Sequence, residues 1–246
     1  MIDTPMTTSN TDSPLGFSSA QESRQALQQE LAKREQQLMQ LRSDCDPITR
    51  ADLHLEIADI MLEIAEPGMQ HAAWGLSRDA FKLALEAEQW ETAVKACDVL
   101  YRADLPASIP ALGNGIWLAV TYPIDTALSI LMLNHLIDAT PEKADGAAIA
   151  AAVAHYLADV RLEGEKRESM MFLTSAMLGK VAERHSQVQS QAQMNLWMNR
   201  LQLLEPAVFL PRLGQVLEAI VEGQWWYDRE LLRSRLPGHD LEELNR

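Results

Sequence analysis

The chain has 246 residues, of which 47% are hydrophobic and 23% are charged, and these proportions are ordinary for a soluble chain that can bury a core. Its 35 acidic residues outnumber its 21 Lys and Arg residues, so the formal net charge is −14. This charge argues against nucleic acid or an anionic membrane as the main partner, because both attract basic surfaces.

The chain starts with a polar segment for which we expect no fixed structure. Residues 1–19 are rich in Ser, Thr, Asp, Pro and Gly, and such a segment cannot bury enough apolar surface to offset the entropy of ordering it. It also lacks the basic start and apolar core of a signal peptide. The longest apolar stretch, residues 127–137, is shorter than the about 20 residues that a membrane-spanning helix needs. Cys45 and Cys97 lie far apart in the sequence, which fits reduced thiols, so we expect a cytoplasmic protein.

The first predicted helix covers residues 20–42. Four leucines fall on one stripe of this helix: Leu27, Leu31, Leu38 and Leu41. Arg34 occupies the position that a continuous apolar seam would fill, so we expect no long coiled coil. Two interpretations remain open. The helix docks on its own domain, or it joins two copies of the chain.

The second predicted helix, residues 46–66, has one apolar and one acidic face. The apolar face consists of Leu53, Ile57, Ile60, Met61 and Ile64. The acidic stripe consists of Asp52, Glu56, Asp59, Glu63 and Glu66. Like charges at this spacing cost a few tenths of a kcal/mol per pair. The stripe is therefore either a solvated face or a docking surface for a basic partner.

Helical periodicity continues along the rest of the chain, and no strand pattern interrupts it. The predicted helices cover residues 69–88, 90–104, 112–121, 125–138, 146–161, 166–184, 187–203, 206–222 and 225–235. Their short connections favour antiparallel hairpins. We therefore expect an all-α fold of about ten helices, with one helical domain over residues 20–236 and a frayed acidic tail over residues 237–246.

An internal repeat relates two of these hairpins at an offset of 34 residues. Trp90-Glu91-Thr92-Ala93-Val94 recurs as Ile124-Asp125-Thr126-Ala127-Leu128. The offset also pairs Cys97 with Leu131, Val99 with Leu133, Leu83 with Trp117 and Leu85 with Ala119, and the two units end at Pro106 and Pro141.

The repeat resembles the tetratricopeptide (TPR) family, whose period is 34 residues. Ala93 and Ala127 match the small residue near the start of the family's second helix. Gly115 matches the small residue of its first helix, whereas Phe81 stands there in the earlier unit. Cys97 and Leu131 replace the large aromatic residue of its second helix. The resemblance covers residues 76–141 and implies antiparallel hairpins stacked as an α-solenoid that binds other proteins.

No catalytic motif and no metal-binding spacing is present in the sequence. The six histidines are scattered: His54, His71, His135, His155, His185 and His239. His155 and Asp159 are four residues apart on one predicted helix and could form a hydrogen bond. Gly113-Asn114-Gly115 falls at a predicted helix start, where it either offers backbone N–H groups to an anion or permits close packing around Gly115. We expect no enzyme activity, metal or cofactor.

Three consecutive aromatic residues near the C-terminal end, Trp225, Trp226 and Tyr227, follow Gly223. They cannot all face one helical core, so we expect at least one ring to be partly exposed. They either cap the core of the last hairpin, because the end of a solenoid must be sealed, or form a partner-binding hot spot.

We expect a protein that binds another protein as an adaptor, assembly factor or chaperone-like accessory protein. The candidate partner-binding residues are Asp52, Glu56, Asp59, Glu63, Asn114, Trp117, Trp225, Trp226 and Tyr227. The acidic surface favours a partner with a basic surface. Two alternatives stay open: a small-ligand or enzyme site in the groove near Asn114, Trp117 and His155, and self-association through residues 20–42.

Overall fold

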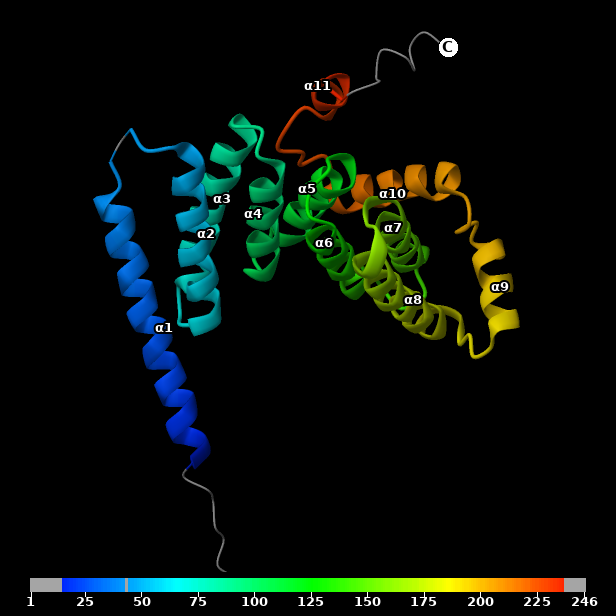
Figure 1. Cartoon of the computed structure of the whole chain (residues 1–246), viewed down its shortest axis with the longest axis horizontal. Coiled ribbons are helices and arrows are strands. Elements are labelled where there is room, and N and C mark those ends of the chain that lie inside the picture. The colour runs from blue at the N-terminus through cyan, green and yellow to red at the C-terminus, as the bar shows by residue number, and fades with distance from the viewer. Residues whose placement is uncertain (1–14, 43, 237–246) are drawn as a thin grey trace, which may run out of the picture.

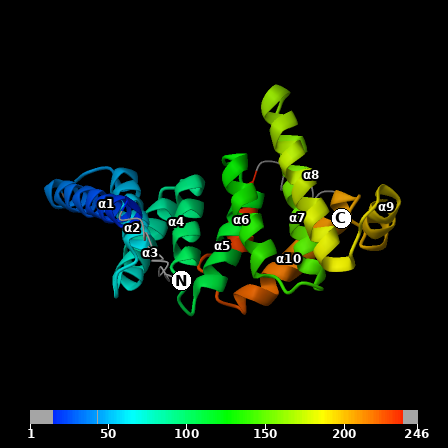
Figure 2. The same cartoon turned by 90° about the horizontal axis from the view of Figure 1, so that it is seen from below.

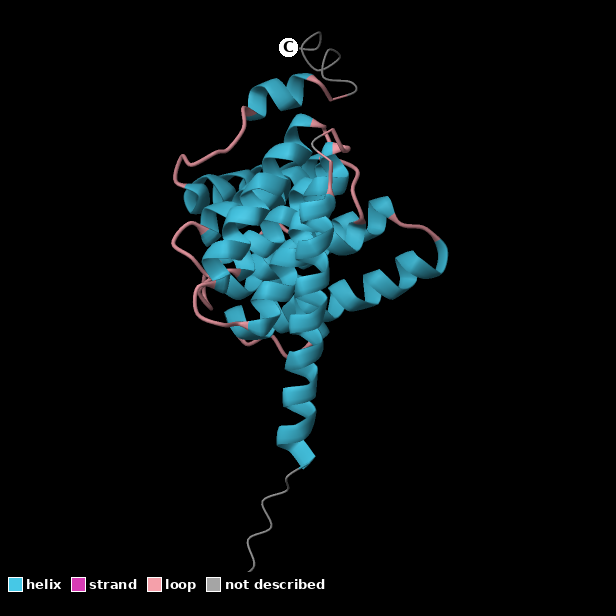
Figure 3. Ribbon diagram, turned by 90° about the vertical axis from the view of Figure 1, so that its left-hand side faces the viewer, coloured by secondary structure: helices cyan, strands magenta, loops and turns pink. Residues whose placement is uncertain are grey.

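The computed structural model describes residues 15–42 and 44–236, and every regular element in this part of the chain is a helix. The predicted all-α fold is therefore confirmed. The helices are α1 (Leu15–Gln40), α2 (Pro47–Ile64), α3 (Met69–Glu86), α4 (Trp90–Arg102), α5 (Ser108–Thr121), α6 (Thr126–Ala139), α7 (Asp145–Arg161), α8 (Gly164–Ser186), α9 (Gln191–Arg200), α10 (Pro206–Val221) and α11 (Arg229–Ser234). Figure 3 shows only helices and loops.

Helices α2, α6, α9 and α11 each begin after a residue whose side chain caps the helix. The Asp46 side chain accepts from the Thr49 backbone N–H at 2.9 Å and starts α2, with Pro47 in the first turn. Asp125 starts α6 in the same way, through the Leu128 N–H at 2.9 Å. Because such caps are local, the predicted starts of α2 and α6 lie within one residue of the observed ones.

Some boundaries differ from the predicted ones. Helix α1 begins at Leu15 rather than at residue 20, while the remainder of the expected N-terminal tail and the whole of residues 237–246 lie outside the described residues. Helix α9 is shorter than the predicted range 187–203, because Gln187 ends α8 in a left-handed conformation and Ser190 caps α9.

Helices α1 to α8 form a row in which each helix packs on the next along the chain (Figures 1 and 2). Residues 76–141, the range of the internal repeat, fall in α3 to α6 of this row. After α8 the chain turns back. Helix α10 lies across α5 and α7 instead of extending the row, and Figure 1 shows it above α7.

The helix predicted over residues 225–235 does not form as one element after α10. The chain runs without regular structure to Asp228, whose side chain caps the short helix α11 by accepting from the Glu230 and Leu231 N–H groups at 3.0 Å. Tyr122 then donates to the Leu232 carbonyl at 3.3 Å, and Arg235 pairs with Glu88 at 2.8 Å. This C-terminal part therefore packs on the middle of the row.

Helix α1 docks on α2 through a small core of its own. Its leucine stripe packs against Leu53, Ile57 and Ile64, with Leu31 buried. Arg34, at the interrupted seam position, pairs with Glu56 at 2.8 Å. The structure thus shows the docked arrangement of this helix.

Two glycines let α5 approach its neighbours closely. A Cβ atom on Gly115 would lie 2.5 Å from Cys97 Cβ, and one on Gly113 would lie 2.4 Å from Val221 Cγ2 of α10. The prediction that these glycines start a helix is wrong, because α5 begins at Ser108 and accommodates Pro110 in its first turn. Gly113 and Gly115 serve packing inside the helix rather than an anion site at its end.

Candidate functional site

The structure brings Asn114 and the C-terminal aromatic residues together, although they are far apart in the sequence. We call residues 224–235 the strap. Asn114 is fully buried on α5, and its Nδ2 donates to the carbonyls of Gln224 at 3.2 Å and Pro110 at 2.9 Å. Its Oδ1 accepts from the Trp226 backbone N–H at 3.0 Å, and its main-chain carbonyl accepts from Tyr227 Oη at 2.6 Å. These bonds hold residues 224–227 in a non-helical path.

The aromatic rings of the strap pack on α3 and α5. Trp226 meets Phe81 edge to face, with ring centroids 5.2 Å apart, and the Arg78 guanidinium lies 3.7 Å above the Trp226 ring. Tyr227 packs against Trp117 at 5.4 Å. Burial raises the pKa of the Tyr227 hydroxyl well above its ordinary value. The rings thus seal the middle of the row and not its last hairpin.

Trp225 points to α10 instead. Its Nε1 donates to Glu218 at 3.0 Å, and the Arg229 guanidinium lies 3.7 Å above its ring while pairing with Glu218. All three residues are of intermediate exposure and pack against the core, so none stands free of the protein.

The acidic stripe is exposed, yet part of it is engaged within the chain. Glu56 pairs with Arg34 at 2.8 Å, and Asp59 pairs with Arg102 of α4. Asp52 accepts from the Thr92 hydroxyl at 3.4 Å, and Glu66 accepts from the Gln28 amide at 3.0 Å. Among the described residues Glu63 makes no ion pair, so less of the stripe is free for a basic partner than its sequence pattern implies.

The predicted groove near Asn114, Trp117 and His155 is not one open site. The strap covers Asn114 and packs on Trp117. His155 lines a separate open cavity of about 470 Å³ between α7, α8 and α9. Its Nδ1 lies 2.9 Å from the Thr174 hydroxyl and not beside Asp159, which pairs with Arg167. Because Thr174 donates to the Met170 carbonyl at 2.9 Å, we assign the His155 proton to Nδ1.

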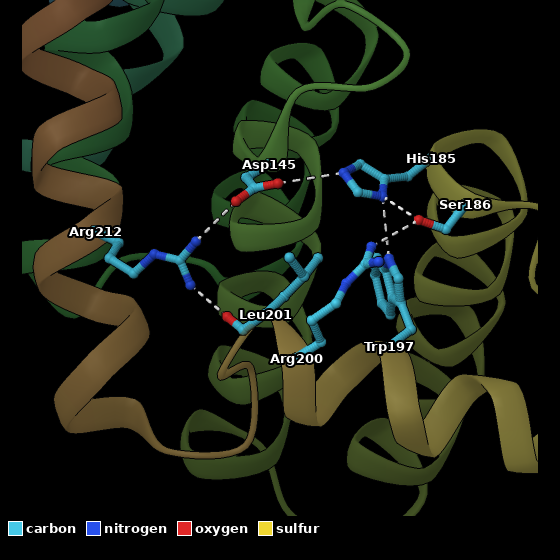
Figure 4. Close-up of polar contacts among 7 residues, drawn as sticks. All are labelled: Asp145, His185, Ser186, Trp197, Arg200, Leu201 and Arg212. Carbon is cyan, nitrogen blue, oxygen red and sulfur yellow. Dashed lines mark hydrogen bonds and ion pairs between the residues drawn. The ribbon is translucent and has the colours of Figure 1, made fainter.

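A Ser–His–Asp cluster that the sequence did not reveal joins α7, α8 and α9 (Figure 4). His185 Nδ1 lies 2.7 Å from Ser186 Oγ, and its Nε2 lies 3.3 Å from Asp145 Oδ1. A catalytic base needs a free lone pair to take the serine proton. Trp197 Nε1 donates to that same Nδ1 at 3.2 Å. The arrangement is therefore suited to fixing Trp197 and not to activating Ser186.

The same cluster ties α10 to the row. Arg212 of α10 pairs with Asp145 at 3.2 Å and donates to the Leu201 carbonyl at the end of α9. Arg200 of α9 donates to Ser186 at 3.2 Å. Partners in this network lie between 1 and 67 residues apart, so no local sequence pattern could indicate it.

A second open groove, of about 350 Å³, lies between α6 and α8. Its lining residues are Asn134, Ile137, Asp138, Leu173, Ala176, Met177, Lys180, Val181 and Arg184. Leu173 is 53% exposed, and the adjacent Phe172 is 79% exposed. The sequence indicates only that the run Met170-Met171-Phe172-Leu173 is too long for all four side chains to face one core, and it does not indicate which of them are exposed.

Within the described ranges no cluster of three or more His, Cys, Asp or Glu side chains could hold a metal ion. None of the helices described is both long and apolar enough to cross a membrane. Comparison of the chain with known protein families, with curated proteins and with solved structures finds no match.

Proposed function

We propose that this protein is a helical scaffold that binds another protein through the groove between α6 and α8. The observation that carries the proposal is the exposure of Leu173, which lines that groove, and of Phe172, which precedes it on α8, because exposed apolar side chains at a groove are typical of interaction sites. The resemblance of residues 76–141 to TPR repeats supports the same role. We propose that it acts in the cytoplasm as an adaptor, assembly factor or chaperone-like protein, without catalytic activity.

The groove favours a helix of the partner as its occupant. Ile137, Met177 and Val181 supply apolar surface from two neighbouring helices. Apolar grooves between helices accept the apolar face of an amphipathic helix, with anchors spaced three or four residues apart. The volume of about 350 Å³ lies at the lower end of the range for binding pockets.

The charged residues of the groove favour an acidic group on that helix. Arg184 donates to the Ile137 carbonyl at 2.9 Å, but its Nε is buried and has no hydrogen-bond partner in the part of the chain described. Lys180 lines the same groove. Asp138 also lines it and accepts from the Asn134 amide at 3.0 Å. A partner carboxylate beside Arg184 and Lys180 would pair with these two cationic side chains.

The proposal is tested by replacing Phe172 and Leu173 together with Ser. A photo-crosslinking residue at position 176 of the groove first identifies the partner in extracts of the source organism, and calorimetry then measures its affinity for purified variants. We expect the double variant to bind at least about tenfold more weakly, a loss of about 1.4 kcal/mol.

Met39→Ser is the matched control, because Met39 of α1 is as exposed as Phe172, at 79%, but lies on a different helix. We expect it to leave the affinity unchanged. Equal affinities of the double variant and the wild-type protein, with the fold intact, would count against this groove.

A further inference from the structure

The surface beneath the strap is built like a peptide-binding site. The Asn114 side-chain amide engages two backbone groups of one non-helical segment, the Gln224 carbonyl and the Trp226 N–H. Peptide-binding grooves commonly obtain affinity from main-chain hydrogen bonds and specificity from pockets for neighbouring side chains. Here the backbone contacts come from one buried residue of α5.

The pockets on both sides of Asn114 select aromatic side chains. Phe81 and Arg78 enclose the Trp226 ring. Trp117 contacts the Tyr227 ring, whose hydroxyl donates to the Asn114 carbonyl. We call this surface, formed by Arg78, Phe81, Asn114 and Trp117, the aromatic groove. Its ligand is an extended segment with two adjacent aromatic residues.

One short hinge connects the ligand segment to α10. Glu222 and Gly223 both have positive φ, 52° and 76°, and reverse the chain where α10 ends. Space is open beside Gly223, where an added Cβ atom would meet nothing within 4 Å. Beyond the groove the strap is held by the contacts of Trp225 and Arg229 with Glu218 of α10, by the Tyr122–Leu232 hydrogen bond and by the exposed Arg235–Glu88 pair. All of these contacts are non-covalent, so the strap can leave the groove by a change at the hinge.

We propose that the aromatic groove also accepts the strap of a second copy of this chain, so that two copies exchange straps and form a dimer. The second copy carries the same Gln224–Tyr227 segment and so fits every contact described above. Exchange of an identical element between copies is a low-cost route to a dimer, because the contacts are the same and only the hinge changes. This dimer differs from the expected self-association through residues 20–42.

The chain's own strap competes strongly with a second copy. A segment tethered by a short hinge has an effective concentration in the millimolar range. Wild-type protein at micromolar concentration should therefore be mostly monomeric. The exchange becomes measurable when a substitution removes the intramolecular contact in one molecule on the groove side only, and in the other on the strap side only.

Two complementary full-length variants provide that condition. The groove variant carries Asn114→Ala and keeps its strap. The strap variant carries Trp226→Ala and Tyr227→Ala and keeps its groove. We expect each variant alone to have the monomer mass in light scattering, and an equimolar mixture at about 100 μM, well below the tethered concentration, to form one-to-one heterodimers.

The outcomes are separated by two further measurements. Circular dichroism checks that each variant is folded, and Arg78→Ala replaces Asn114→Ala if the latter unfolds. A fluorescent peptide of residues 222–235 should bind the strap variant at least about tenfold more tightly than it binds the wild-type protein, and the same peptide with Trp226→Ala should not bind.

A mixture of folded variants that stays monomeric overturns the exchange, whether or not the peptide binds. A strap variant that does not bind the peptide overturns the groove.

Discussion

Asp98 joins three helices through one buried carboxylate. Its Oδ1 lies 2.8 Å from His135 Nε2 of α6, and its Oδ2 accepts from Arg102 Nε at 2.8 Å. Arg102 also pairs with Asp59 of α2. Burial alone would raise the pKa of Asp98, but the hydrogen bond with His135 and the charge of Arg102 outweigh it, so the pKa is lowered.

Replacing Asp98 with Asn should reduce the free energy of unfolding by about 2 kcal/mol at pH 7. Because the pKa of Asp98 is lower in the folded state, its contribution is complete above the unfolded value of about 3.9 and is lost as the pH falls through the folded value. Urea unfolding should thus show a smaller difference between wild type and variant below about pH 4 than at about pH 5. A difference that persists unchanged at lower pH would contradict this assignment.

Gly115 is expected to tolerate no side chain. Gly115→Ala places a Cβ atom 2.5 Å from Cys97 Cβ and from Met132 Cε, and overpacking of this kind costs about 1–3 kcal/mol. Gly75→Ala on α3 is the matched control, because nothing lies within 4 Å of its added Cβ, and replacing a helical glycine with alanine there should stabilise by up to about 1 kcal/mol. Thermal unfolding of the two variants should therefore shift in opposite directions. A Gly115→Ala variant as stable as the wild-type protein would refute the close approach.

At the level of elements, arginines satisfy the carbonyl groups that helix ends leave unpaired. Arg161 at the end of α7 donates to the Ala119 and Val120 carbonyls of α5, at 2.9 and 2.8 Å. Arg184 of α8 and Arg212 of α10 do the same for α6 and α9. A cation at a helix C-terminus also interacts favourably with the helix dipole. These three arginines therefore connect the C-terminal ends of α5, α6 and α9 to later helices.

Arg161→Lys should lose about 1 kcal/mol of stability, because an ammonium group cannot reproduce the two parallel bonds of the guanidinium. Arg161→Met should lose more, since the carbonyls then lack a charged donor. Arg167→Lys is the control, because the Arg167–Asp159 pair is nearly half exposed and pairs of this kind contribute about 0–1 kcal/mol. Urea unfolding measures all three variants, and equal losses for Arg161→Lys and Arg167→Lys would refute the capping role.

The elements themselves were predictable because their signals are local. Caps such as Asp46 and Asp125, and the apolar stripe of residues 20–42, mark helices without knowledge of the fold. The strap was not predictable. Its path depends on Asn114, which lies 110 residues before Gln224, and these contacts override the helical pattern of residues 225–228. The exposed Phe172 also needed the structure, because periodicity does not say which helix covers which face.

For the whole molecule, the excess of acidic residues should oppose compactness. A net charge of −14 repels itself, and salt screens such repulsion between exposed groups. The ion pairs of the acidic stripe offset part of the repulsion at Glu56 and Asp59 but not at Glu63.

Glu63→Gln should therefore stabilise the protein at low salt by a few tenths of a kcal/mol, which raises the melting temperature slightly. This gain should vanish at about 1 M salt, where the screening length is only about 3 Å. Glu56→Gln should give no gain, because it also removes the Arg34–Glu56 ion pair. Differential scanning calorimetry of both variants at low and high salt measures these shifts. A melting temperature for Glu63→Gln that is insensitive to salt would show that repulsion does not govern the stripe.

The strap covers the aromatic groove, and the two are made at different times during protein synthesis. Phe81, Asn114 and Trp117 are made long before Trp226 and Tyr227, which cover them. The 110 residues that separate Asn114 from Gln224 take about ten seconds to translate at about 10 residues per second. For that interval a nascent chain holds an uncovered aromatic surface. Its yield in the cell should therefore depend on what shields that surface until the strap leaves the ribosome.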